Sequence, residues 1–187
     1  MTRLGHNNGP TMEAGTAWRR HAWSRARAEL LPSLPIEVVR LRIRRAAEIG
    51  LDYRAYASFR AASGHDIVAL LFSTNALGLL PPRPGLPAAR AARLEAITHT
   101  ARAALARAPL TPEAVLALAG GRIDHAAPGP RTHASWSEAR GALLAALAPA
   151  RWPAQQVLMV GDAPDERGWA EAARLGLYLP AERYFAA

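Results

Sequence analysis

The fold of this chain depends on residues 66–77, DIVALLFSTNAL. The apolar run Ile67–Phe72 predicts a buried element, but two kinds of element fit it. The run is a helix if Asp66 caps it, since an aspartate oxygen accepts hydrogen bonds from the first turn of a helix. Otherwise it is a strand that leads into the polar turn Ser73-Thr74-Asn75. Periodicity leaves both open, and the choice matters because two separated strands are the minimum for a parallel sheet.

Most of the remaining chain has helical patterns. The segment 36–49 alternates as V-R-L-R-I-R, as in a half-buried strand, yet it also carries a helical stripe of apolar residues. Pro35 before it and Gly50 after it favour the helix. We also expect helices over 18–31, 53–62, 88–108, 112–118, 136–148 and 169–175, a loop over 120–135, and a strand Val157–Val160. These patterns predict a mainly helical fold, of the α+β or α/β class, with a basic helical N-terminal third and a small C-terminal strand–turn–helix unit.

Composition suggests four regions along the chain. Residues 1–15 are polar and glycine-rich, which is typical of a flexible arm. Residues 16–80 are the basic helical region, and PPRPGLP at 81–87 is a proline-rich connector. Residues 88–187 form the helical or αβ remainder. We expect this remainder to make one globular unit with residues 16–80.

All of the positive charge is arginine. The chain of 187 residues has 23 arginines and no lysine, a bias typical of a GC-rich bacterial genome. The arginines are nevertheless unevenly placed. Residues 1–60 hold 11 arginines against five acids, a net charge of +6, whereas residues 61–187 hold 12 against 10. This asymmetry predicts an anionic partner, either nucleic acid or an acidic protein, that meets the N-terminal third.

Other features exclude several classes of site. The chain has no cysteine, so disulfides, thiolate nucleophiles and cysteine-based zinc sites are excluded. It has no G-x-S-x-G, G-x-G-x-x-G or P-loop motif, and no two of its six histidines are spaced to share a metal on a helix. Asp124, His125 and His133 share one loop and are the nearest approach to a metal site. No apolar run is long enough to span a membrane. We therefore expect a cytoplasmic protein with no cofactor, no metal and no membrane partner.

The strongest candidate for a binding site is a helix-turn-helix over residues 37–62. That motif needs a small residue where the helices cross, a residue that tolerates positive φ, an apolar residue and a helix cap. Ala46, Gly50, Leu51 and Asp52 supply these in order. Tyr56 and Phe59 would then face the core. The residues predicted to contact nucleic acid are Arg40, Arg42, Arg44 and Arg45 at the phosphates and Tyr53, Arg54, Ala57 and Ser58 in the groove.

The segment VLMVGDAPDERG at 157–168 suggests a different function. It resembles the last motif of haloacid-dehalogenase-type phosphohydrolases, in which an apolar strand ends in Gly-Asp and a second carboxylate follows four residues later. The resemblance implies that Asp162 and Glu166, with Asp165 beside them, ligate Mg²⁺. If residues 67–72 are a strand, Ser73 or Thr74 resembles that family's phosphate-binding hydroxyl. However, the family's nucleophile requires Asp-x-Asp, which occurs nowhere in this chain.

The N-terminal LGHNNGP at residues 4–10 resembles a GHNN-plus-proline segment found in uncharacterised, often phage-associated bacterial proteins, and implies no activity. The leading hypothesis from the sequence is therefore a non-enzymatic binding or adaptor protein that contacts nucleic acid through arginine-rich helices. The alternative is a protein–protein component of a larger assembly. A phosphohydrolase-like enzyme without a recognisable nucleophile ranks third.

Overall fold

The structure is a computed structural model that describes residues 34–79 and 85–186. The predicted arm 1–15, the predicted helix 18–31, the GHNN segment and most of the connector 81–87 lie outside the described residues. The chain divides into the units Met1–Val39 and Arg40–Ala187. The first six described residues belong to the first unit and include the start of helix α2. The account below concerns the second unit and α2.

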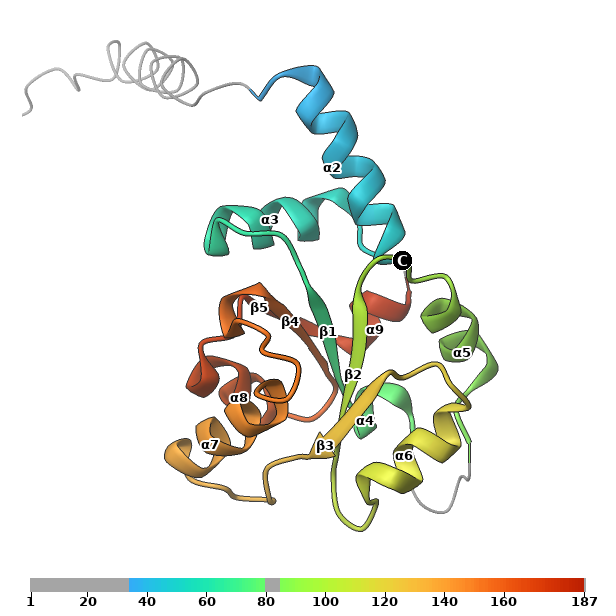
Figure 1. Cartoon of the computed structure of the whole chain (residues 1–187), viewed down its shortest axis with the longest axis vertical. Helices are drawn as coiled ribbons and strands as arrows, with labels where there is room; N and C mark the ends of the chain where they lie inside the picture. The colour runs from blue at the N-terminus through green and yellow to red at the C-terminus, as the bar shows by residue number, and fades with distance from the viewer. Residues whose placement is uncertain (1–33, 80–84, 187) are drawn as a thin grey trace, which may run out of the picture. The chain divides into compact units, whose positions relative to one another are not determined.

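The second unit is an α/β fold built on a five-stranded, wholly parallel sheet (Figure 1). The strand order is β3-β2-β1-β4-β5. The strands are β1 Ala69–Ser73, β2 Ala101–Ala106, β3 His125–Pro128, β4 Val157–Gly161 and β5 Leu177–Pro180. The helices are α2 Ile36–Glu48, α3 Tyr53–Ser63, α4 Thr74–Leu77, α5 Ala88–Glu95, α6 Pro112–Ala119, α7 Trp136–Leu147, α8 Glu166–Ala173 and α9 Ala181–Phe185, with a 3₁₀ turn η2 at Ala154–Gln156.

The prediction of a mainly helical fold with only a small C-terminal strand unit is wrong. Residues 66–77 decide this, because β1 is the central strand of the sheet and pairs with β2 on one side and β4 on the other. All five residues of β1 are buried. A strand covered on both faces needs no polar alternation, so its sequence is a continuous apolar run. Asp66 does not cap a helix; its carboxylate accepts hydrogen bonds from the Tyr56 hydroxyl and the Ile67 amide.

Three other strands are absent from the prediction. The predicted helix 88–108 is α5 followed by β2, the predicted loop 120–135 contains β3, and β5 follows the predicted helix 169–175. The sequence of β2, ARAALA, consists of residues with high helix propensity. Its place between β1 and β3 overrides that propensity, because strand preference depends mainly on packing against neighbouring strands.

The helices cover both faces of the sheet. Leu70 and Phe72 of β1 belong to a core cluster with residues of α3, α5, α6 and α9, whereas Leu71 belongs to a cluster with residues of α7 and α8. This alternation follows from the period of two along a strand. Figure 1 shows α7 and α8 side by side on the face of the sheet to which Leu71 points.

The strand order fixes where a site is expected. The chain runs from β1 to β2 to β3, and then crosses by way of α7 to β4 on the other side of β1. The direction of winding therefore reverses between β1 and β4. In open parallel sheets, ligands bind at the carboxyl ends of the strands beside such a reversal.

Candidate functional site

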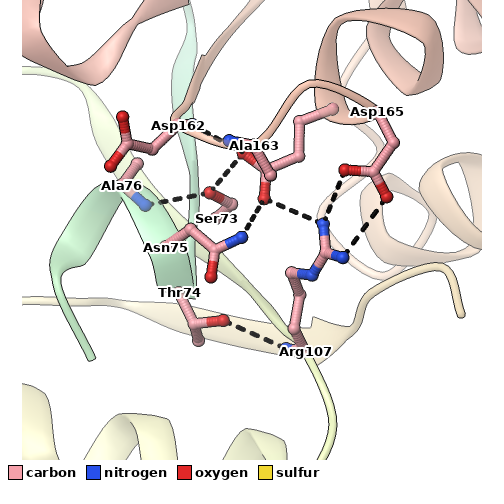
Figure 2. Close-up of polar contacts among 9 residues, drawn as sticks. Ser73, Thr74, Asn75, Ala76, Arg107, Asp162, Ala163 and Asp165 are labelled. Atoms are coloured by element: carbon pink, nitrogen blue, oxygen red, sulfur yellow. Dashed lines mark hydrogen bonds and ion pairs between the residues drawn. The ribbon is translucent and has the colours of Figure 1, made fainter. Parts of the chain in front are cut away.

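A cluster of polar side chains lies at the carboxyl ends of β1, β2 and β4 (Figure 2). Ser73, Thr74 and Asn75 follow β1, and Arg107 follows β2. The loop after β4 supplies backbone amides and the Asp165 side chain, and Glu166 is the first residue of α8. We call this set the strand-edge cluster; its members are Ser73, Thr74, Asn75, Arg107, Asp162, Ala163, Asp165 and Glu166.

Glu166 is the centre of the strand-edge cluster and is fully buried. Its Oε2 atom accepts hydrogen bonds from the Ser73 hydroxyl at 2.8 Å and from the backbone amides of Asp162 at 2.7 Å and Ala163 at 3.0 Å. Its Oε1 atom accepts from Asn75 Nδ2 at 2.9 Å and Arg107 Nη1 at 3.2 Å. An ionised carboxylate is stable in the interior only with such compensation.

Arg107 provides the compensating positive charge. Besides Glu166, its guanidinium contacts both carboxylate oxygens of Asp165, at 3.0 and 3.3 Å, and lies 4.7 Å from the ring centroid of Trp169. Burial acts to lower the pKa of Arg107, but the hydrogen bonds and charges of Asp165 and Glu166 outweigh it, so its pKa is raised. Burial, followed by the charge of Glu166, raises the pKa of the neighbouring Tyr178.

Local backbone structure orients the remaining members. Ser73 is the N-cap of α4, and its Oγ atom accepts a hydrogen bond from the Ala76 amide while donating to Glu166 (Figure 2). The Thr74 hydroxyl accepts from the Arg107 amide at 3.2 Å. Gly161 ends β4 without a side chain at the point where Glu166 Oε2 approaches the backbone.

This arrangement does not suit the chemistry that the phosphohydrolase resemblance implies. Ser73 is fully buried, and its proton is committed to Glu166. Both oxygens of Glu166 are saturated by donors, and Asp165 is engaged by Arg107. Among the described residues, no three histidine, aspartate or glutamate side chains are grouped so that they could hold a metal ion. The cluster is therefore arranged to surround a carboxylate with donors, which is the opposite polarity to a magnesium site.

The predicted helix-turn-helix has the expected local features. The helices α2 and α3 occupy the predicted segments, Ala46 and Leu51 are buried, and Gly50 has a φ of +68°. Asp52 caps α3, with its Oδ1 atom 2.7 Å from the Ala55 amide. Tyr56 and Phe59 are buried, as predicted.

The predicted nucleic-acid contacts do not form one face. Arg40, Arg44, Arg54 and Ser58 are exposed, whereas Arg42, Tyr53 and Ala57 are half-buried. Arg42 projects from the side of α2 opposite to Arg40, because two residues correspond to about 200° of helical rotation.

Arg45 points into the fold. Its side chain is 17% exposed and donates hydrogen bonds to Asp66, Glu48 and Thr100 and to the carbonyls of Ile67 and His99. Glu48 is on α2 itself, but the other four partners lie directly before β1 and β2, so Arg45 ties α2 to the sheet.

The apolar stripe predicted on α2 is mostly exposed. Among Ile36, Val39, Ile43, Ala46 and Ala47, Ala46 alone is buried. Ile43 is 48% exposed, and Leu41 on another side of the helix is 56% exposed.

Asp124, His125 and His133, the predicted loop residues nearest to a metal site, are not grouped as metal ligands in the described part of the chain. Asp124 pairs with Arg102, whose guanidinium and backbone amide both donate to it. His125 begins β3, whereas His133 follows the end of that strand.

The sequence named parts of the strand-edge cluster but missed Arg107 and Asn75. Arg107 was overlooked because β2 was predicted to be helical. The detectable signal is a polar residue at the end of an apolar run, which is present at Ser73 and Asp162; Arg107 has no such signal, because it follows the alanine-rich β2.

Comparison with models of protein families, with curated proteins and with solved structures found no match to this chain. Within residues 34–79 and 85–186, no helix has both the length and the hydrophobicity needed to cross a bilayer.

Proposed function

We propose that this chain is a non-enzymatic binding protein in which the parallel sheet is a rigid scaffold and helices α2 and α3 contact nucleic acid. The observation that carries the proposal is a contrast in solvent exposure. The side chains that bond to Glu166 are buried or half-buried at the carboxyl ends of the strands, whereas Arg40, Arg44 and Arg54 are exposed. The exposed arginines of the two helices are therefore the groups that we propose to meet an external ligand.

Three arginines are the proposed phosphate contacts. Arg40 and Arg44 are four residues apart on α2, so they lie on the same side of the helix with Cβ atoms about 6 Å apart. Arg54 lies in the first turn of α3. Ser58, one turn further along α3 and exposed, is placed to donate a hydrogen bond in the same region. Arg45 is not included, because its donors are already engaged.

Salt dependence of duplex binding tests this proposal. Each phosphate contact steepens the plot of log K against log salt concentration by about 0.9. The triple variant Arg40→Gln, Arg44→Gln, Arg54→Gln should therefore flatten the slope by about 2.7. The matched control is Arg131→Gln, Arg151→Gln, Arg174→Gln, which removes the same charge from exposed positions outside the two helices. Equal effects of the two variants, or no binding by the unaltered chain, would reject these contacts.

A second candidate, a protein partner in a larger assembly, is favoured by one specific observation. Leu41 and Ile43 are exposed beside Arg44, and large apolar side chains of this kind gain little from a phosphate backbone. Arginines flanked by apolar residues suit an acidic protein surface, to which a guanidinium binds bidentately. The double variant Leu41→Ser, Ile43→Ser separates the two candidates. It should leave duplex binding unchanged if nucleic acid is the partner, and abolish stoichiometric co-purification if a protein is.

A further inference from the structure

The Glu166 side chain is held as a bound anion would be. Five donors converge on its two oxygens, from β1, α4, the segment after β2 and the loop after β4. These donors are a hydroxyl, an amide, a guanidinium and two successive backbone N–H groups. Successive N–H groups that point at one oxygen form the concavities in which proteins bind anions. The donors therefore constitute a complete receptor for an oxyanion.

The backbone at Gly161 fits closely against both the Tyr178 ring and the Glu166 carboxylate. A Cβ atom added to Gly161 would lie 2.7 Å from Glu166 Oε2 and 2.6 Å from the Tyr178 ring. Contacts this short do not occur in folded proteins, so no other residue fits at position 161 while the carboxylate is in place. The absence of a side chain here makes room for the Tyr178 ring and for the anion against the end of β4.

We propose that the strand-edge cluster is an oxyanion-binding site that the chain occupies with its own Glu166 side chain, which closes the site to external carboxylates and phosphates. The internal ligand is matched to its receptor, since each oxygen accepts at least two hydrogen bonds at 2.7–3.2 Å. The atoms of Glu166 beyond Cβ are a methylene and a carboxylate, and these have almost the size and charge of an acetate ion. Removal of the side chain therefore leaves a site shaped for acetate.

The test is anion rescue of the full chain carrying Glu166→Ala. Thermal unfolding is followed in sodium acetate and in sodium chloride of equal ionic strength. We expect acetate, and not chloride, to raise the Tm of this variant by about 3–6 °C for each tenfold increase above its Kd. The unaltered chain, whose site is occupied, should show no such rise. Glu166→Gln is the matched control, because its amide fills the same space and leaves no room for acetate.

Two further arms decide where the anion binds and which anions the site accepts. Adding Ser73→Ala and Arg107→Gln to Glu166→Ala removes two of the donors and should abolish the response to acetate. If the response persists, acetate binds elsewhere and the proposal is wrong. Inorganic phosphate replaces acetate in a parallel titration; a rise with either anion supports an oxyanion site, and a rise with neither overturns it. If Glu166→Ala is unfolded in chloride, recovery of its helical signal in acetate supports the proposal, and failure to recover refutes it.

Discussion

Arg45→Gln is the substitution that best distinguishes an arginine that stabilises the fold from the arginines proposed to bind a partner. Arg45 donates to five acceptors, and it bridges α2 to the amino ends of β1 and β2. Its shortest contact is 2.7 Å, to the Thr100 hydroxyl. Glutamine is too short to reach these acceptors and carries no charge, so all five hydrogen bonds are lost together.

The expected cost follows from the exposure of the partners. The side chains of Glu48 and Asp66 are 41% and 44% exposed, so each ion pair contributes about 0.5 kcal/mol. The three hydrogen bonds to Thr100 and to the carbonyls of Ile67 and His99 contribute about 0.5–1 kcal/mol each. The free energy of unfolding should therefore fall by about 2.5–4 kcal/mol, which corresponds to a decrease in Tm of roughly 5–15 °C.

Chemical denaturation of the variant measures this loss directly. Arg44→Gln is the control, since Arg44 is the neighbouring residue on the same helix and is exposed; its effect should stay within about 0.5 kcal/mol. Below its Tm, Arg45→Gln should bind a nucleic-acid duplex with the same salt dependence as the unaltered chain. A loss of stability below about 0.5 kcal/mol, which is the usual range for surface substitutions, would refute the bridging role. A change in the salt slope would instead assign Arg45 to the phosphate contacts.

Two further predictions concern the packing of the same unit. Burial, followed by the hydrogen bond to Asp66, raises the pKa of Tyr56 from 10.0 to about 12 in the folded chain. The stability that Tyr56 provides over Tyr56→Phe should therefore be constant below pH 10 and disappear as the pH rises through about 12, as measured by denaturation across that range; a difference independent of pH would contradict this. Gly176→Ala should cost about 2–3 kcal/mol, because the new Cβ would lie 2.4 Å from the Gln155 carbonyl oxygen and 2.5 Å from Phe59 Cε2. Gly141→Ala, in the interior of α7 with nothing within 4 Å of the new atom, should stabilise the chain by about 0.5–1 kcal/mol; the same sign for both alanines would reject the packing argument.

The strand-edge cluster shows why a site can be partly predicted from sequence. Ser73 and Thr74 are candidate site residues in the sequence because the apolar segment before them fits a buried strand. Asp162, Asp165 and Glu166 are candidates because Gly161 and Asp162 follow a predicted apolar strand. Both segments carry their own signal, namely an apolar run that stops at polar residues. Arg107 carries none, because β2 is rich in alanine, and alanine reports helix propensity rather than burial. The phosphohydrolase resemblance therefore implied metal ligands at carboxylates whose neutralising guanidinium the sequence pattern does not reveal.

Local features were determined by the sequence itself. The boundaries of α2 and α3, the cap at Asp52 and the positive φ of Gly50 follow from residues a few positions apart, and a short segment is enough to specify them. The pairing of β1 with β2 and β4 was decided only in the tertiary structure, as was the burial of Glu166 among donors that are separated from it by up to 93 residues. The physical reason is that a parallel strand has no hydrogen-bond partner within its own segment. Such a segment becomes a strand only after distant parts of the chain have assembled beside it. The charges at its carboxyl end are balanced only then as well.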